Sequence, residues 1–379
     1  MDFSLSEEQE LLRSEVRRFA EERIAPGVRQ RDRAREFPHE IVKEMGELGL
    51  LGMLVPEAYG GAGLDTLSYA VAVEEVARVC PATAGVMSVT NSVCCWPISK
   101  FGTETVKLGP LRELASGECI GGFGLTEPGS GSDAASMRST ARRDGDFYVL
   151  DGEKAWITNA GEGRYFVVMA KTDPGAGSRG ISAFVVPADS PGFSVGVSED
   201  KMGLRASHTA ALSFSGCRVP RENLLGVEGQ GFKIALQTLD HSRLGIAAQA
   251  VGIHQRALEL GVAYAKDRMQ FGRPIAEHQA IQFKIATIAT ELAAARLQLR
   301  YAALNEGRPD AGRLAAQAKL FATEAANRAC YESLQIHGGN GFCEDYDIAR
   351  LYRDVRVTTI YEGTSEMQRL VIARRLLSA

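Results

Sequence analysis

The chain has 379 residues, of which 45% are hydrophobic and 24% charged, which is enough for two or three globular domains. Its formal net charge is -4, and no run of Lys and Arg forms the basic footprint of a nucleic-acid-binding surface. No apolar stretch reaches ~18 residues, and the first residues lack the basic and apolar regions of a signal peptide. These features argue against nucleic-acid binding and against insertion into a membrane.

The seven cysteines are scattered, with no Cys-x-x-Cys pair and no histidine at the spacing of a metal ligand. This pattern predicts no metal site and is typical of buried free thiols, so the sequence favours a reducing cytoplasm. The chain also lacks a Gly-x-Gly-x-x-Gly turn, a Walker A sequence and a His-Glu-x-x-His pair. Rossmann-type nicotinamide binding, P-loop chemistry and zinc proteolysis are therefore unsupported.

The first third of the chain has the pattern of helices. Ser6 and Gln9 stand at the spacing of a capping box, and apolar residues then recur at helical spacing. Helical patterns continue to about residue 118. We therefore expect an α-helical domain over residues 1–120.

The middle third changes to short runs rich in β-branched and aromatic residues, namely 147–150, 165–169 and 181–186. Such runs predict strands, and the Asp151-Gly152 step after the first run predicts a hairpin. We therefore expect a small antiparallel, barrel-like β domain over residues 121–228.

The last third returns to long amphipathic helices. The clearest apolar stripe is spaced by alternating four and three residues, at Ile281, Ile285, Ile288, Leu292, Ala295, Leu299 and Ala302. A stripe of this kind is what a helix bundle needs. We expect a helical bundle over residues 229–379 and an α+β fold in the order helix, sheet, helix.

Three segments are too polar for a core and combine glycine with hydroxyl, aromatic or carboxylate groups. The first, residues 124–133, has glycines that let backbone N–H groups approach a ligand, with the hydroxyls of Thr126 and Ser132 nearby. From composition alone this segment could equally be an ordinary Gly/Ser-rich loop.

The second and third segments supply a flat ring and an acid. Trp156 stands beside Thr158 on an expected strand, and an aromatic face suits an isoalloxazine, although a strand Trp is more often part of a core. Glu362 stands between an aromatic residue and Gly363, where the helical pattern is interrupted near the carboxyl end. A glutamate on such a break can project into a cleft.

Together these segments resemble the acyl-CoA dehydrogenase family, and its short-chain, or butyryl-CoA, members are the most similar. Five motifs occur in order and at the family's spacing, at residues 125–133, 156–158, 268–272, 335–339 and 361–364. The resemblance covers essentially the whole chain. It implies a helical N-terminal domain, an antiparallel β domain and a C-terminal four-helix bundle, usually assembled as a homotetramer that is a dimer of dimers.

The resemblance implies that the cofactor is FAD. The residues implied at the flavin ring are Leu125, Thr126, Trp156, Ile157 and Thr158. Those implied along the diphosphate and adenosine are Arg268, Phe271, Gln279, Gln335, Gly338, Gly339, Thr364 and Glu366. An arginine fork suits a diphosphate, and in the family Arg268 and Phe271 typically reach across a subunit interface.

The resemblance also implies a reaction and its base. Glu362 takes the α proton of a short-chain acyl-CoA, the β hydride goes to flavin N5, and trans-2-enoyl-CoA is the product. The enolate oxygen is held by the backbone N–H of Glu362 and a ribityl hydroxyl of FAD, in the manner of an oxyanion hole. The implied substrate contacts are Ser132, Asp240, Arg243 and Gly363, although Asp240 and Arg243 could instead form an ordinary helix salt bridge.

Residues 85–92, toward which the acyl tail should run, are similar to those of short-chain members. They contain no Arg, which disfavours a dicarboxylic, glutaryl-type substrate. A branched short-chain substrate stays open, because one methyl group changes pocket preference by only ~1–3 kcal/mol. The implied partner is an electron-transfer flavoprotein and the implied pathway fatty-acid β-oxidation. The alternatives are an acyl-CoA oxidase and a non-catalytic flavoprotein.

Overall fold

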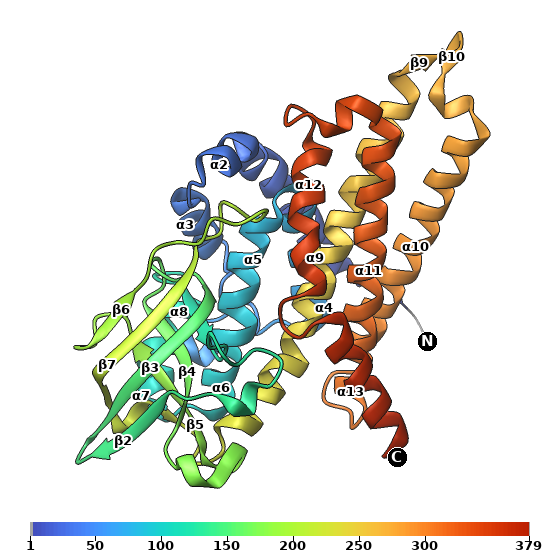
Figure 1. Cartoon of the computed structure of the whole chain (residues 1–379). Helices are drawn as coiled ribbons and strands as arrows, with labels where there is room; N and C mark the ends of the chain where they lie inside the picture. The colour runs from blue at the N-terminus through green and yellow to red at the C-terminus, as the bar shows by residue number, and fades with distance from the viewer. Residues whose placement is uncertain (1–2, 379) are drawn as a thin grey trace.

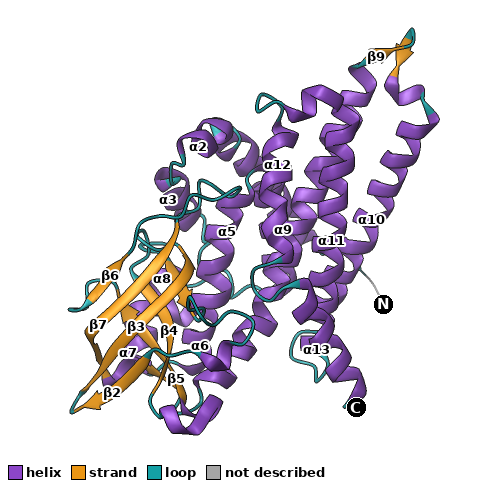
Figure 2. Cartoon of the chain, viewed as in Figure 1, coloured by secondary structure: helices purple, strands orange, loops and turns teal. Residues whose placement is uncertain are grey.

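The computed structural model describes residues 3–378. Helices form its first part, a sheet its middle and long helices its last part, so the predicted order is confirmed (Figures 1 and 2). These transitions support the three predicted domain ranges, which we keep as a proposal. Met1, Asp2 and Ala379, which those ranges include, lie outside the described residues.

The N-terminal part consists of mostly short helices. The predicted capping box is confirmed, because the Ser6 hydroxyl accepts from the Gln9 backbone at 3.2 Å and Gln9 Oε1 accepts from the Ser6 backbone at 3.1 Å. The helices are α1 (Glu7–Phe19), α2 (Val28–Ala34), α3 (His39–Glu47), α4 (Thr66–Val79), α5 (Pro81–Val89), α6 (Trp96–Phe101), α7 (Glu104–Val106) and α8 (Arg112–Ala115). Twelve of the fourteen residues of α4 are buried, so α4 is a core helix.

The middle part is a sheet with the strand order β6-β7-β3-β2-β4-β5-β8 and β1 beside β4. Its strands are β1 (Gly121–Gly124), β2 (Thr140–Asp144), β3 (Phe147–Thr158), β4 (Tyr165–Lys171), β5 (Ile181–Pro187), β6 (Phe193–Val195), β7 (Thr209–Pro220) and β8 (Leu224–Leu225). Most neighbours pair in the predicted antiparallel sense, but β1 and β2 both pair with β4 in parallel.

Strand β4 is buried on both faces. Tyr165 and Val167 pack in one hydrophobic cluster with Leu114 of α8, while Phe166 and Val168 face a second cluster inside the β domain. A strand covered on both sides needs a continuous apolar run instead of alternation. This double burial joins the β domain to the N-terminal helices.

The predicted hairpin at Asp151-Gly152 is wrong. Strand β3 continues through this step, with a register shift at Gly152, whose φ is 136°. A Cβ at Gly152 would lie 2.4 Å from Ser139 Oγ, so the glycine serves a β-bulge with a close backbone contact. The turn instead falls at Gly145 and the residue after it, where β2 and β3 pair.

The C-terminal part is the predicted bundle, in which long helices pack side by side (Figure 1). Its helices are α9 (Gly231–Asp267), α10 (Gln279–Leu304), α11 (Ala311–His337) and α12 (Asp347–Val355), followed by α13 (Ser365–Leu377). Most of the predicted stripe on α10 is buried, from Ile288 to Ala302, while Ile281 and Ile285 pack at its edge. A short hairpin of β9 (Met269–Gln270) and β10 (Arg273–Pro274) projects from one end.

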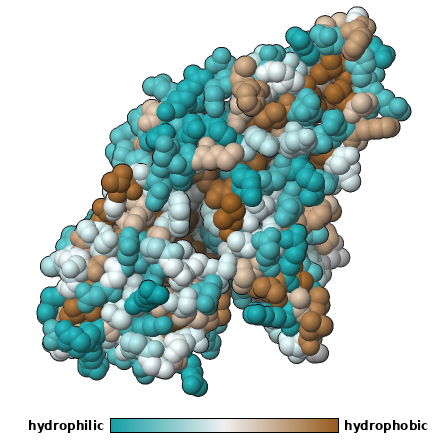
Figure 3. Space-filling view, viewed as in Figure 1, coloured by the Kyte–Doolittle hydropathy of each residue, from teal (hydrophilic) through white to brown (hydrophobic). Residues whose placement is uncertain are grey.

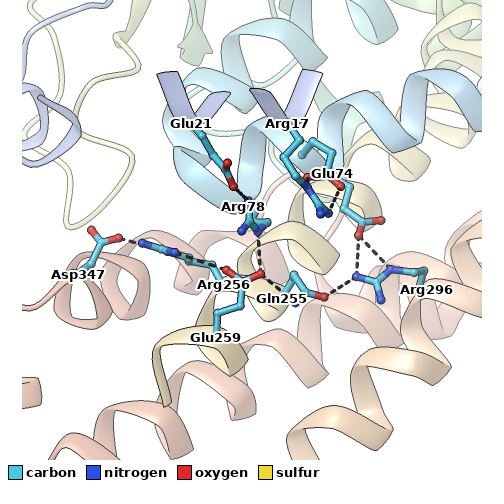
Figure 4. Close-up of polar contacts among 10 residues, drawn as sticks. Arg17, Glu21, Glu74, Arg78, Gln255, Arg256, Glu259, Arg296 and Asp347 are labelled. Carbon is cyan, nitrogen blue, oxygen red and sulfur yellow. Dashed lines mark hydrogen bonds and ion pairs between the residues drawn. The ribbon is translucent and has the colours of Figure 1, made fainter. Parts of the chain in front are cut away.

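Ion pairs fasten the N-terminal helices to the bundle (Figure 4). Arg78 of α4 donates to Glu259 of α9 and to Glu21, each at 2.7 Å. Arg296 of α10 donates to Glu74 of α4 at 2.7 Å. Helix α4 therefore holds a fixed place against α9, which matters because both helices contribute to the candidate site.

No helix between residues 3 and 378 combines the length and the apolar character needed to cross a membrane.

Candidate active site

Glu362 lies in a short non-helical segment between the 3₁₀ turn Arg356–Thr359 and α13. Its φ is 50° and that of Gly363 is 91°, so two consecutive residues are left-handed. For a glutamate this conformation costs about 1–3 kcal/mol, and such strain is concentrated at functional sites. The segment ends where the Thr364 hydroxyl accepts from the Met367 backbone at 3.3 Å and begins α13.

The Glu362 carboxylate faces the interior, and its Oε2 is buried without a hydrogen-bond partner among the described residues. Burial raises the pKa of Glu362 to about 7, and the opposing hydrogen bond from Ser242 and the charges of Lys319 and Arg243 do not cancel this rise. A carboxylate with this pKa is half deprotonated near neutral pH and is suited to act as a general base. Its unpaired oxygen is available to a ligand.

The backbone around Glu362 is also arranged for a ligand. The carbonyl of Gly363 accepts from Lys319 Nζ at 2.7 Å and from Gln368 Nε2 at 2.8 Å. The backbone N–H of Glu362 donates to no group within residues 3–378. A free backbone donor beside a buried acid can stabilise negative charge on a bound oxygen.

Helix α9 forms one wall of the site with residues one turn apart. The Ser242 hydroxyl donates to the carbonyl of Leu239 at 3.3 Å and lies close enough to the Glu362 carboxylate to lower its pKa. Gln249 accepts from the hydroxyl of Tyr361. Between Ser242 and Gln249 lies Gly245, where a Cβ would come within 2.4 Å of Tyr69 Oη. Glycine is therefore required for the close approach of α4 to α9.

The predicted substrate pair, Asp240 and Arg243, also lies on this wall. The two side chains form an ion pair with each other, so the helix salt bridge considered as the alternative is present. Arg243 is nonetheless buried, and its Nε has no partner among the described residues. Asp240 also accepts from Arg375 of α13 at 3.1 Å. The pair can thus be structural and still face a ligand.

The middle domain brings together the residues predicted at the flavin ring. The backbone N–H of Ala155 donates to the carbonyl of Thr126 at 2.9 Å, which places the loop after β1 beside Trp156. Leu125 and Ile157 are buried, Thr158 is half-buried, and Ser132 is exposed on the Gly-rich loop. The residues predicted at the flavin ring that lie in this region are Leu125, Thr126, Trp156, Ile157 and Thr158.

Trp156 has an unusual conformation for its residue type. It lies in the second register shift of β3, its φ is 62°, and 62% of the residue is exposed. A bulge redirects a side chain out of the sheet, and a bulky residue at positive φ is strained. The strand thus presents a flat aromatic side chain at its surface instead of burying it in a core.

The remaining predicted cofactor residues lie elsewhere. Phe271 is 92% exposed on the hairpin that projects from the bundle, next to Arg268 (Figure 1). Arg268 and Arg243 are 25 residues apart along α9, or about 37 Å at ~1.5 Å per residue. Gln279, Gln335, Gly338 and Gly339 are exposed near the same end of the bundle. One chain therefore does not bring these residues to Glu362.

Thr364 and Glu366 lie next to Glu362 at the start of α13, and Glu366 is exposed. The predicted residues thus form one group on the β domain, a second around Glu362 and α9, and a third at the far end of the bundle.

Sequence reasoning missed the side chains that support these groups. Lys154 is buried and donates to Glu127 at 2.6 Å, beneath the Gly-rich loop. Burial alone would raise the pKa of Glu127, but hydrogen bonds from Lys154 and Ser139 lower it to about 2, so the pair is charged. Lys319 was missed as well. A lysine within an otherwise apolar helical face is the one local signal available for it.

Three family models together match almost the whole chain. The N-terminal domain of acyl-CoA dehydrogenases matches residues 6–118, the middle domain residues 122–217 and the C-terminal domain residues 229–377. The chain belongs to the acyl-CoA dehydrogenase family. The predicted resemblance is therefore confirmed, and the protein is a flavin oxidoreductase that acts on CH–CH groups.

Several acyl-CoA dehydrogenases and related structures are similar over the full chain. The mitochondrial short-chain specific acyl-CoA dehydrogenase of Mus musculus is 50% identical over 374 residues, which cover 98% of this chain and 91% of that protein. The structure of butyryl-CoA dehydrogenase from Megasphaera elsdenii is similar with a TM-score of 0.97 and 43% sequence identity. A structure from work on the electron transferring flavoprotein of Acidaminococcus fermentans is similar with a TM-score of 0.98 and 46% sequence identity. Each match covers 100% of both chains.

Acyl-CoA dehydrogenases are FAD-dependent, and FAD is the cofactor of this enzyme. The residues present fit that group. Trp156 offers an exposed aromatic face, and the guanidinium of Arg268 has no side-chain partner within residues 3–378. A Cβ at Gly338 or Gly339 would meet nothing within 4 Å, so a ligand can approach that backbone closely.

Proposed function

We propose that this acyl-CoA dehydrogenase oxidises short-chain acyl-CoA to trans-2-enoyl-CoA, with Glu362 as the catalytic base. The observation that carries the proposal is the Glu362 carboxylate, whose Oε2 is buried without a partner and whose pKa is raised to about 7. It lies next to its own free backbone N–H. An acid and a donor in this arrangement suit the removal of a proton next to a thioester carbonyl.

The chain's own groups account for the proton step. The Glu362 carboxylate takes the α proton, while its backbone N–H donates to the thioester oxygen as negative charge develops there. One such donor is worth ~3–4 kcal/mol in other enzymes. Bound FAD supplies the acceptor for the β hydride. Loss of one proton and one hydride leaves a double bond between the α and β carbons.

We assign the cofactor and substrate contacts by group. The flavin ring lies against Leu125, Thr126, Trp156, Ile157 and Thr158, and the rest of FAD contacts Arg268, Phe271, Gln279, Gln335, Gly338, Gly339, Thr364 and Glu366. The substrate contacts Ser132, Asp240, Arg243 and Gly363. The buried Nε of Arg243 that lacks a partner supports this role over a purely structural ion pair.

A short acyl chain fits the wall behind Glu362. Tyr69 Oη and Ser88 Oγ hydrogen-bond at 2.8 Å, and both lie against Gly245 of α9. Ser88 belongs to the segment toward which the acyl tail is expected to run. This contact between α4, α5 and α9 limits the depth available to the chain. The similarity to short-chain specific and butyryl-CoA dehydrogenases supports the same short acyl chain length.

We propose a homotetramer, a dimer of dimers, that passes electrons to an electron-transfer flavoprotein. Apolar side chains gather over the end of the bundle that carries the hairpin (Figure 3), and Phe271, Phe283 and Phe342 are 92%, 62% and 88% exposed. Large exposed apolar surfaces are typical of interaction sites. The free cysteines fit a cytoplasmic enzyme of fatty-acid β-oxidation.

The test is anaerobic titration of the FAD-loaded enzyme with acyl-CoA thioesters of increasing length and branching, followed by flavin absorbance. We expect the fastest bleaching with straight chains of roughly four to six carbons. Fastest bleaching with isobutyryl-CoA or 2-methylbutyryl-CoA would instead assign a branched-chain enzyme, and no bleaching with any thioester would refute the proposal. Fast reoxidation of the reduced flavin in air would indicate an oxidase.

A further inference from the structure

Two side chains from different helices hold the backbone next to Glu362. Lys319 of α11 donates to the carbonyl of Gly363 at 2.7 Å. Gln368 of α13 donates to the same carbonyl at 2.8 Å and to the carbonyl of Glu362 at 3.3 Å. Both carbonyls of the strained segment are therefore fixed from outside it, while the N–H of Glu362 stays free.

Lys319 is an unusual residue for such a position. It is fully buried, and within residues 3–378 it donates to this neutral carbonyl and forms no salt bridge. Burying an ammonium group without a paired carboxylate is costly, so packing alone gives no reason for a lysine here. The charges that act on it come from Glu362, Glu324 and Glu366 at longer range, and from Arg243.

The glycine after Glu362 belongs to the same arrangement. A Cβ at Gly363 would lie 2.8 Å from Gln368 Nε2, and the φ of Gly363 is 91°. A side chain would push Gln368 away and would also strain the backbone. The segment is thus shaped so that the amide of Gln368 can reach both carbonyls.

We infer that Lys319 and Gln368 are positioning residues, which hold the Glu362–Gly363 peptide so that the carboxylate and the N–H of Glu362 point at the same substrate. This inference rests on the role of Glu362 in the proposed function. If the carbonyls were released, the strained segment would relax toward ordinary φ values, and the base and the donor would move relative to each other. Lys319 has a second effect, because its charge favours the ionised form of Glu362.

The experiment compares Lys319→Met and Gln368→Met with the full-length, FAD-loaded wild type. Both changes remove the donor and leave an unbranched side chain of similar length. Thr323→Val is the matched control, since Thr323 is buried on α11 one turn from Lys319 and bonds to its carbonyl at 2.8 Å. The measurements are exchange of the substrate α hydrogen in D₂O by mass spectrometry, anaerobic flavin reduction, FAD content and thermal unfolding.

We expect each of the two Met variants to slow α-hydrogen exchange and flavin reduction about 10- to 100-fold, the cost of a misplaced catalytic group, with KM changed less than about threefold. The Thr323→Val control should react at nearly the wild-type rate. The two variants should differ in their pH profiles. Loss of the Lys319 charge moves the rise in rate to higher pH, because Glu362 then ionises less readily, whereas Gln368→Met leaves the midpoint in place.

The outcomes separate this inference from the proposed function. Wild-type exchange rates in both Met variants, or an equal loss in Thr323→Val, would overturn the positioning role. If Lys319→Met does not fold, Gln368→Met decides the matter, since it removes no charge. Normal exchange in Glu362→Gln would instead overturn the assignment of the base, and with it the proposed function.

Discussion

The site around Glu362 and the surface predicted to bind the far end of FAD are built in opposite ways. The Oε2 atom of Glu362 is buried by its own chain, and Lys319 and Gln368 of the same chain donate to the carbonyls of Gly363 and Glu362. Arg268 and Phe271 stand on an exposed hairpin about 37 Å along α9 from that site. The acid is thus held by groups of its own chain, whereas Arg268 and Phe271 are exposed.

This difference suggests that folding of one chain completes the surroundings of Glu362, whereas the cofactor site depends on assembly. Glu362 acquires its raised pKa when the single chain folds, because burial by its own chain is the main cause. In the proposed oligomer the hairpin residues would reach FAD in a second subunit, so the proposal makes the complete cofactor site depend on assembly. Substitutions in the two regions should therefore have different consequences for chemistry and for cofactor binding.

The largest effect is expected from Glu362→Gln. The amide cannot accept the α proton, and loss of a general base typically slows a reaction about 10²- to 10⁴-fold. FAD content and acyl-CoA affinity should stay close to the wild-type values, because the backbone is unchanged. Stopped-flow flavin reduction measures the rate. The control is Glu291→Gln on α10, which makes the same chemical change at a half-buried carboxylate paired with Arg328. A normal rate of bleaching in Glu362→Gln would show that the pocket does not supply the base.

A second prediction concerns the cost of burying the acid. The pKa of Glu362 is about 7 in the folded chain and ~4.3 in an unfolded one, so the native state binds more protons between these values. Stability due to this group therefore falls as pH rises from ~4.3 to 7, and the loss is complete above pH 7. Relative to wild type, the free energy of unfolding of Glu362→Gln should rise by at most about 4 kcal/mol above pH 7 and should not change near pH 4.

Denaturant unfolding of wild type and Glu362→Gln at several pH values measures this difference. A difference that does not change with pH would mean that the carboxylate is solvated in the folded state. The pocket would then lack the burial on which the comparison depends.

The third prediction tests the other region. Arg268→Ala should weaken FAD binding roughly tenfold to a hundredfold, the cost of losing charged hydrogen bonds to a diphosphate. The pKa that governs flavin reduction should stay the same. Isothermal titration of the apoenzyme with FAD measures the affinity, and Arg273→Ala on the neighbouring strand is the control.

Mixed oligomers sharpen this test. When Arg268→Ala and Glu362→Gln subunits are co-expressed, Arg268 of a Glu362→Gln subunit can bind FAD in a partner subunit that keeps Glu362. Random pairing would give active sites in about a quarter of subunits. No recovery of activity would mean that Arg268 does not act between subunits.

The spacing of residues along the sequence was sufficient to predict part of this structure. The stripe on α10 and the capping box at Ser6 follow from spacing alone and are confirmed. The hairpin at Asp151-Gly152 was wrong, because the close approach of Ser139 uses the glycine for a bulge, and that contact comes from outside the strand. A dipeptide carries no information about such a neighbour.

Local sequence predicts even less of the residues around Glu362. Glu362 is recognisable because a glutamate before a glycine interrupts a helical pattern. Lys319 and Gln368 have no such signal, since the bond from Lys319 to Gly363 spans 44 residues and depends on how α11 meets α13. The position of Arg268 far from Glu362 also depends on tertiary structure, because it is the length and course of α9 that separate the two residues.

The smallest effect is expected at Gly245. An alanine Cβ there would lie 2.4 Å from both Ser88 Oγ and Tyr69 Oη, so the two hydroxyls must move into the space behind Glu362. Overpacking of this kind typically costs about 1–3 kcal/mol, and Gly245→Ala should slow flavin reduction by longer acyl chains about tenfold more than by propionyl-CoA. Adding Ser88→Ala removes one of the two clashes and should restore part of the loss.

Gly261→Ala is the matched control, because it adds a methyl group on the same helix, 3.0 Å from Ser333 Oγ and 16 residues beyond Gly245. It should lower stability without changing the preference for chain length. If both alanine variants shift the chain-length profile equally, the effect is transmitted through α9 as a whole. If only Gly245→Ala shifts it, the contact of Tyr69 with Ser88 closes the acyl channel. The region around Glu362 then determines the length of the substrate as well as the pKa of the base.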